Sequence, residues 1–185
     1  MQDYHEFLKE ILIPEETIQK RICELGAQIS QDYKSQELIM ICILRGAMIF
    51  FTDLIRHITV PLTVDFLAVS SYGVGARHST GRARITLDLN TNIQDCHVLL
   101  VEDIVDSGYT IKAVLDFLET RRPSTLRVCT LLDKQERREV AVPIHYRGFV
   151  IPDKFVFGYG LDVDEFYRNL PFIGVLDLEN FDRTE

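Results

Sequence analysis

Long apolar segments are missing from this sequence of 185 residues. Its longest apolar runs are about ten residues, whereas a membrane-spanning helix needs about 20. The first residues, Met1 to Glu10, are polar and acidic, so they lack the basic start and apolar centre of a secretory signal peptide. We therefore expect a cytoplasmic protein that does not bind a membrane.

Basic residues are scarce relative to acidic ones. The chain has 20 Lys and Arg against 28 Asp and Glu, which gives a net charge of −8. This charge disfavours a protein that binds nucleic-acid backbones over a broad face, so we expect no nucleic-acid partner. It does not exclude an anionic small molecule, because backbone N–H groups and a few cations can hold a phosphate locally.

Glycine, proline and cysteine are also few. With 10 Gly, 6 Pro and 46% hydrophobic residues, the composition excludes collagen and low-complexity disorder. The four cysteines (Cys23, Cys42, Cys96 and Cys129) form no CxxC pair and have no histidine pair at zinc spacing. Cys42 and Cys129 lie in apolar runs, so we expect reduced core thiols.

Strand and helix patterns alternate along the chain. The predicted strands are 38–44, 62–70, 85–89, 98–101 and 126–132, with shorter candidates at 149–151, 155–157 and 172–176. Apolar spacing predicts helices from 13 to 29, from 47 to 58 and after 110. Such alternation implies βαβ units and a mainly parallel sheet, in a single domain of residues 1–185. The polar, Gly-rich stretch 71–81 predicts a lid, a binding loop or a disordered loop.

The most informative segment runs from Val98 to Thr110. Ligands of open α/β sheets bind beyond the carboxyl ends of the strands, where Glu102 and Asp103 follow the apolar run VLLV. The next residues, Asp106 to Thr110, open a helix whose free N–H groups can hold a phosphate. Carboxylates beside a phosphate site suit sugar hydroxyls or Mg²⁺. The alternative is a strand end with solvated acids and an ordinary helix cap.

The string VLLVEDIVDSGYT resembles the signature of the phosphoribosyltransferases that use phosphoribosyl pyrophosphate (PRPP). ILRGA, SSYG, LLDK and IPDKFVFGYGLDVDEFYRNLP follow the family order, and the last string is similar to the bacterial hypoxanthine(-guanine) branch. The resemblance covers about residues 11–177. It implies a type I phosphoribosyltransferase fold, with a mainly parallel central sheet flanked by helices, a small hood and a flexible loop.

The resemblance also implies a reaction. A ribosyl phosphate moves from PRPP to N9 of hypoxanthine or guanine, giving IMP or GMP and pyrophosphate, with Mg²⁺ as the cofactor. Relatives form homodimers or homotetramers, so one of these states is expected. By resemblance, Asp106 is the catalytic proton acceptor near purine N7, and Glu102 and Asp103 hold the ribose and the metal. The 5′-phosphate loop comprises Asp106, Ser107, Gly108, Tyr109 and Thr110.

The remaining site residues are also assigned by resemblance. The pyrophosphate-binding residues are Leu44, Arg45, Gly46 and Arg168, and family members carry a non-proline cis peptide in the first of these segments. The purine-binding residues are Lys134, Phe155, Val156 and Asp162, of which Asp162 is also a metal ligand. The flexible loop contains Ser71 and Tyr72.

Some alternatives stay open. Arg45 and Lys134 could be solvated surface charges, and Phe155 could be a core residue. A regulator that keeps the fold but binds RNA would need a basic face, which the net charge disfavours. A dehydrogenase-like nucleotide-binding protein would need G-x-G-x-x-G or GxxxxGK[ST], and neither motif is present. The sequence does not decide between hypoxanthine, guanine and xanthine.

Overall fold

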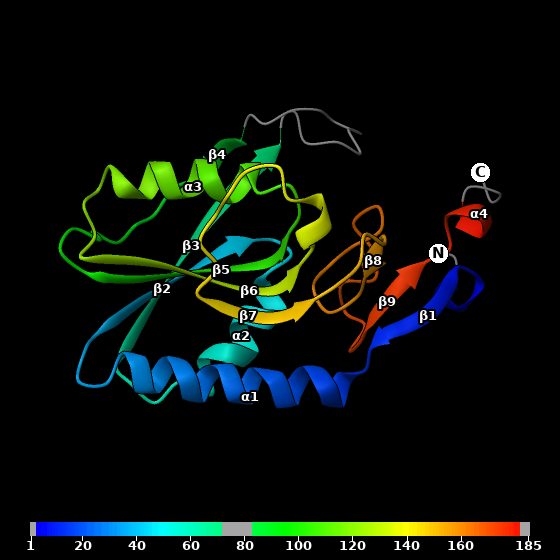
Figure 1. The fold of residues 1–185 in the computed structure, drawn as a ribbon, viewed down its shortest axis with the longest axis horizontal. Helices are drawn as coiled ribbons and strands as arrows, with labels where there is room; N and C mark the ends of the chain where they lie inside the picture. The colour runs from blue at the N-terminus through cyan, green and yellow to red at the C-terminus, as the bar shows by residue number, and fades with distance from the viewer. Residues whose placement is uncertain (1–2, 72–82, 182–185) are drawn as a thin grey trace.

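The structure is a computed structural model that describes residues 3–71 and 83–181. The described strands form two sheets, a larger one ordered β4-β3-β2-β5-β6-β7 and a smaller one ordered β1-β9-β8 (Figure 1). The strands of the larger sheet are β2 (Leu38–Leu44), β3 (Leu62–Ser71), β4 (Ala83–Leu87), β5 (His97–Val105), β6 (Thr125–Asp133) and β7 (Tyr146–Val150). Every neighbouring pair in this sheet is parallel except β3 and β4. The carboxyl ends of β2, β5 and β6 therefore reach the same edge.

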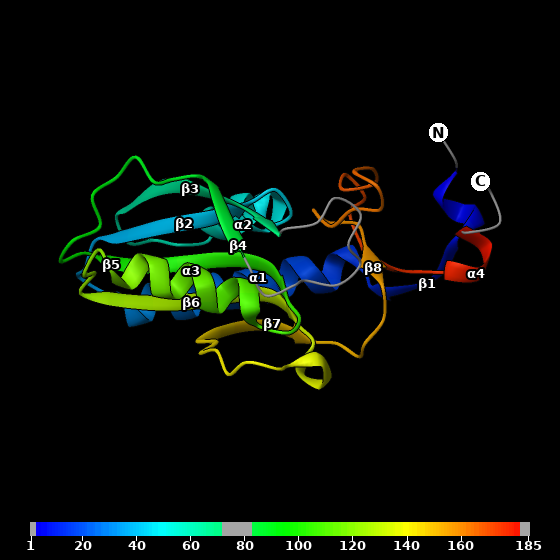
Figure 2. The same ribbon diagram turned by 90° about the horizontal axis from the view of Figure 1, so that it is seen from above.

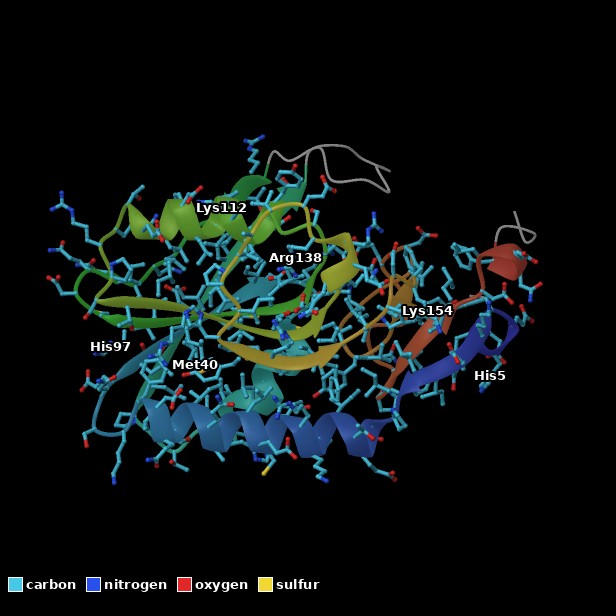
Figure 3. The ribbon with its side chains drawn as sticks, in the orientation of Figure 1. His5, Met40, His97, Lys112, Arg138 and Lys154 are labelled. Atoms are coloured by element: carbon cyan, nitrogen blue, oxygen red, sulfur yellow. The ribbon has the colours of Figure 1, made fainter. Side chains whose placement is uncertain are left out.

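Helices cover both faces of the larger sheet (Figures 1 and 2). They are α1 (Glu15–Asp32), α2 (Met48–Ile55) and α3 (Tyr109–Glu119). Strand β2 is buried on both faces, because its alternate side chains enter different core clusters. Met40 and Cys42 pack with α1 and α2, whereas Ile41 and Ile43 pack with α3 (Met40 is labelled in Figure 3). The predicted doubly buried strand is thus confirmed.

A smaller sheet stands at one end of the molecule (Figure 1). It comprises β1 (Leu8–Ile13), β8 (Val156–Phe157) and β9 (Ile173–Leu176), and it has its own core around Phe7 and Phe157. Short helical turns η1 (Tyr4–Glu6), η2 (Gln135–Arg137) and α4 (Leu178–Phe181) complete the described elements. Strand β1 was not predicted, because half of its side chains face solvent and only Ile13 is buried.

Other boundaries differ modestly from the predictions. Strand β5 continues through Glu102 and Asp103 to Val105 instead of ending before the acids. The cause is the pairing with β6, which continues past the acids to Val105. In β4, buried and exposed side chains do not alternate as predicted, because Leu87 at the sheet edge is 43% exposed. Helix α2 ends at Ile55, three residues earlier than expected. In the predicted flexible loop, Ser71 is the last residue of β3 and Tyr72 lies outside the described residues.

The cysteine prediction is confirmed. All four cysteines are free, and Cys42 and Cys129 are buried. Burial raises the pKa of the Cys42 thiol to about 12, so this thiol stays protonated and unreactive at neutral pH. Among the described helices, none combines the length and the apolar character that crossing a membrane requires.

Candidate active site

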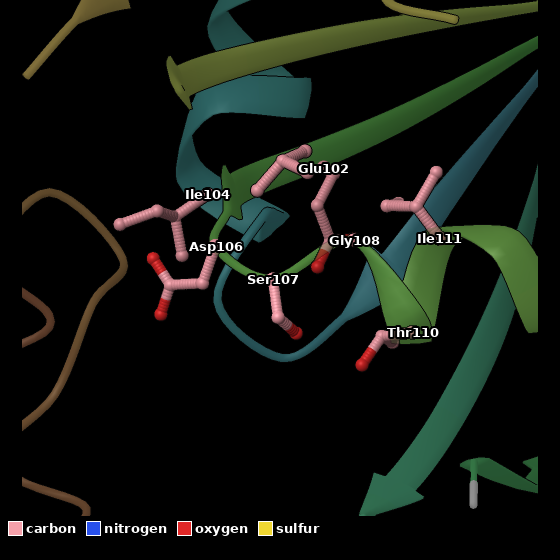
Figure 4. Close-up of a pocket in the computed structure, with 8 residues that line it drawn as sticks. Glu102, Ile104, Asp106, Ser107, Gly108, Thr110 and Ile111 are labelled. Atoms are coloured by element: carbon pink, nitrogen blue, oxygen red, sulfur yellow. The ribbon is translucent and has the colours of Figure 1, made fainter. Parts of the chain in front are cut away.

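A cavity of about 140 Å³ lies where β5 passes into α3 (Figure 4). Its lining comes from the predicted segment and comprises Glu102, Ile104, Val105, Asp106, Ser107, Gly108, Thr110 and Ile111. Figure 4 shows Asp106, Ser107 and Thr110 following one another around the turn between strand and helix. Tyr109 begins α3 but does not line the cavity. The cavity therefore combines a helix N-terminus with hydroxyl and carboxylate side chains.

Gly108 makes this turn possible. Its φ of +94° lies in the left-handed region, which favours glycine. A Cβ at this position would also lie 2.6 Å from the carbonyl oxygen of Val140. The chain thus enters α3 in close contact with the segment that follows β6, and the first amides of the helix open towards the cavity.

The acidic pair lies at the end of β5. Glu102 is 9% exposed, and its Oε2 atom is buried without a hydrogen-bond partner. Burial and the neighbouring Asp103 raise the pKa of Glu102 well above its usual range. Burial also raises the pKa of Asp103 to about 6, against the opposing effect of the Ile104 N–H group. The pKa of Asp103 stays raised although the positive charge of Arg168 acts to lower it, so a divalent cation and ribose hydroxyls fit the chemistry of the pair.

The two acids do not face the same neighbours. Glu102 lines the cavity, whereas the Asp103 carboxylate packs against Gly46. A Cβ on Gly46 would lie 1.6 Å from Asp103 Oδ2. Only glycine therefore allows the segment after β2 to lie against the acidic pair. Within the described residues, no group of three or more His, Cys, Asp or Glu side chains is assembled for a metal.

The predicted pyrophosphate segment follows β2. The peptide bond between Leu44 and Arg45 is cis. The Gly46 carbonyl oxygen would lie 2.0 Å from a Cβ on Gly160, so a second glycine allows the turn after β8 to approach. Segments that are far apart in the sequence thus meet beside Asp103.

Two guanidinium groups converge at this place. Arg45 Nη2 lies 2.7 Å from Glu165 Oε1, and Arg168 Nη2 lies 3.0 Å from Glu165 Oε2. Arg168 also forms an ion pair of 2.8 Å with Asp162 and donates to the Gly160 carbonyl oxygen. The structure therefore brings together the two cations predicted for pyrophosphate. In the same arrangement, the Asp162 carboxylate is engaged by a cation rather than open to a metal.

The predicted purine residues lie beyond β6. Lys134 is only 6% exposed, which excludes a solvated surface lysine. Its Nζ atom lies 3.5 Å from Asp106 Oδ1 and 3.8 Å from Asp153 Oδ1. Phe155 is 44% exposed, so it is not a core residue, and Val156 is buried. A confined ammonium group, a carboxylate and an exposed ring are thus available to a planar polar ligand.

Sequence reasoning missed a cluster behind the cavity. Asp133 is 1% exposed and lies between two guanidinium groups. Arg138 contacts its Oδ1 atom, and Arg147 Nε lies 2.7 Å from its Oδ2 atom. The signal in the sequence was an aspartate closing an apolar strand, followed by several charged residues. Charged runs are common on surfaces, so the run alone did not indicate a buried cluster.

Comparisons with known proteins agree with this geometry. Residues 12–164 match the model of the phosphoribosyl transferase domain family. A hypoxanthine phosphoribosyltransferase of Haemophilus influenzae is 46% identical over 173 residues, covering 92% of this chain and 96% of the relative. The hypoxanthine phosphoribosyltransferase of Salmonella typhimurium is 48% identical over 167 residues, covering 89% and 93%. A crystal structure of the Staphylococcus aureus hypoxanthine phosphoribosyltransferase matches with a TM-score of 0.90 and 45% identity, covering 95% of each chain.

Proposed function

The chain belongs to the phosphoribosyltransferase family and has the type I fold, and we propose that it is a purine-salvage enzyme. It transfers a ribosyl phosphate from PRPP to hypoxanthine, and also to guanine, and it releases pyrophosphate. The products are IMP and GMP. The relatives over most of the chain are hypoxanthine and hypoxanthine-guanine phosphoribosyltransferases, which supports this substrate class.

One observation carries the proposal. Lys134 Nζ lies 3.5 Å from Asp106 Oδ1, and Asp106 lines the cavity at the N-terminus of α3. A donor for a purine oxygen and an acceptor for a purine proton therefore lie side by side next to a phosphate-binding turn. A ligand that joins a 6-oxopurine to a ribose 5-phosphate needs this combination of groups.

The protein's part in the reaction is positioning and charge stabilisation. The turn from Asp106 to Thr110 would hold the 5′-phosphate, and Glu102 and Asp103 would bind the ribose hydroxyls. Arg45 and Arg168 would bind the departing pyrophosphate after releasing Glu165. Asp106 would accept the proton that leaves the purine. General-base catalysis of this kind typically accelerates a reaction by ~10²–10⁴-fold. Fixing both substrates in line avoids much of the entropic cost of their encounter.

Magnesium is the proposed cofactor. The unpartnered Oε2 of Glu102 and the raised pKa of Asp103 support a divalent cation at this pair. When bound, Mg²⁺ would neutralise charge on the pyrophosphate group as it leaves. Asp162 is proposed as a further ligand, which requires it to leave the ion pair with Arg168.

Lys134 is also proposed to set the base preference. An ammonium group only donates hydrogen bonds, so it favours a 6-oxo acceptor and disfavours the 6-amino group of adenine. Phe155 would stack on the base, and the backbone at Val156 would bind its edge. Discrimination between hypoxanthine and guanine would rest on backbone acceptors for the exocyclic amine.

Assembly and location complete the proposal. We propose a homodimer or homotetramer that works in the cytoplasm. Exposed apolar side chains on α2 and β3 (Met48, Val64 and Phe66) support self-association through this surface. Sedimentation of the wild type and of Phe66→Glu tests it, because a charge at this surface should shift the population towards monomer.

Product analysis tests the proposed reaction. The protein is incubated with PRPP, hypoxanthine and Mg²⁺, and the products are separated by chromatography. IMP and pyrophosphate should appear in equal amounts. A folded protein that binds PRPP but makes no nucleotide from any purine would contradict the proposal and favour a regulatory binding role.

A further inference from the structure

The segment after β6 binds successive carbonyl groups of the cavity turn. Arg138 donates from Nη2 to the Val105 carbonyl oxygen at 3.3 Å and from Nε to the Asp106 carbonyl oxygen at 3.0 Å. The backbone N–H groups of Glu139 and Val140 both donate to the Ser107 carbonyl oxygen at 3.0 Å. Every carbonyl from 105 to 107 is therefore tied to one bracing segment, residues 138–140, and Figure 3 shows the place of Arg138 beside the sheet.

These bonds also orient the amide groups of the turn. In a trans peptide, the N–H of one residue points away from the carbonyl of the residue before it. Carbonyls that are held towards the bracing segment turn the N–H groups of Asp106, Ser107 and Gly108 to the opposite side. Since these residues line the cavity, their donors are turned towards the cavity.

Arg138 is itself held in place. Its side chain is mostly buried, and Nη2 forms an ion pair with the buried Asp133. Arg147 pairs with the other oxygen of the same carboxylate at 2.7 Å. Within the described residues, Arg147 makes no hydrogen bond or ion pair with the cavity turn. The planar guanidinium of Arg138 reaches the carboxylate and both carbonyls, which the single ammonium of a lysine cannot reproduce.

We infer that Arg138, anchored by Asp133, is a positioning residue that presents the backbone donors of the cavity turn to the 5′-phosphate. The inference rests on the proposed function, because it assumes that a nucleotide phosphate occupies the cavity. Arg138 acts through the backbone and touches neither the base nor the reacting carbon. Its removal should weaken ligands that carry the 5′-phosphate and spare those that lack it.

The test compares IMP with inosine, the same nucleoside without its phosphate. Affinities are measured by calorimetry for the wild type, Arg138→Gln, Arg138→Lys and the matched control Arg147→Gln. Arg138→Gln should lose about tenfold in IMP affinity, roughly the effect of one charge-assisted hydrogen bond, with inosine affinity unchanged. Arg138→Lys should fall between the wild type and Arg138→Gln. Arg147→Gln should lower the melting temperature without changing the ratio of the two affinities.

Several results would overturn the inference. Equal losses for IMP and inosine in Arg138→Gln would show a general structural role. An unchanged IMP affinity would show that the carbonyl contacts do not matter for binding. If Arg147→Gln changed the ratio of IMP affinity to inosine affinity as much as Arg138→Gln does, the loss would come from disturbing Asp133 rather than from losing the contact between Arg138 and the turn. If Arg138→Gln does not fold, Arg138→Lys carries the comparison. A wild type that binds no IMP would refute the proposed function instead.

Discussion

Replacing Lys134 by methionine should weaken the purine substrate selectively. Methionine keeps most of the apolar stem but removes the charge and the hydrogen-bond donor. Lys134 is 6% exposed, so water cannot easily take the place of the lost ammonium group. A hydrogen bond from a charged group is worth about 1.5–3 kcal/mol, which corresponds to roughly 10- to 150-fold in affinity.

The measured quantities are the KM values for hypoxanthine and for PRPP, each at saturating co-substrate. In Lys134→Met, the KM for hypoxanthine should rise by roughly 10- to 150-fold. The KM for PRPP should change by less than about threefold, because the phosphate turn keeps its backbone donors. Lys20→Met, which removes an exposed lysine from α1, is the matched control and should leave both values unchanged.

The same variant tests base preference. Without the ammonium group, the site no longer rewards a 6-oxo acceptor, so the advantage of hypoxanthine over adenine should shrink by a similar factor. Equal increases in both KM values would refute the assignment of Lys134 to the purine. An unchanged KM for hypoxanthine, in a variant whose melting temperature matches the wild type, would refute it as well.

Three further predictions concern Asp106, the acidic pair and Gly46. Asp106→Asn should lower kcat by about 10²-fold or more, whereas the PRPP affinity measured by calorimetry should stay within about threefold of the wild type. An equal loss of kcat and of PRPP affinity would contradict a role of Asp106 in proton transfer. The pKa of Asp103 is raised to about 6, so the metal-free protein loses stability as pH rises from about 4 to about 6. Because Mg²⁺ binds the ionised carboxylate, the increase in melting temperature caused by Mg²⁺ should be larger at about pH 8 than at about pH 5. That pH-dependent gain should disappear in the double variant Glu102→Gln/Asp103→Asn, because Glu102 also has a raised pKa, and its persistence there would move the metal elsewhere. Gly46→Ala would place a Cβ 1.6 Å from Asp103 Oδ2, so PRPP turnover should fall at least about tenfold, and wild-type kinetics would show that the close approach is not needed.

Strands β2 and β5 were predictable because each contains a continuous apolar run. A strand such as β2, buried on both faces, has no room for polar side chains, so its sequence is distinctive. Strand β1 was not predictable, because it is stabilised by pairing with β9 near the opposite end of the chain. Half of its own side chains are exposed, and only the tertiary contact identifies it.

The site residues were found where they form a local pattern. Glu102 to Thr110 is one continuous segment, so its chemistry can be recognised without a fold. The meeting of Arg45 with Arg168 at Glu165 depends on tertiary structure. The burial of Asp133 between Arg138 and Arg147 likewise depends on the packing of the segment after β6. Charged residues on separate segments give no sequence signal for such clusters.

The most direct test of the central claim is the ratio of kcat/KM for hypoxanthine to kcat/KM for adenine. Both are measured with PRPP and Mg²⁺ on one preparation of the wild type, with guanine and xanthine run in parallel. A site that donates to a 6-oxo group should prefer hypoxanthine by at least about 10³-fold. Use of adenine at a comparable kcat/KM would contradict the assignment of this site to 6-oxopurines.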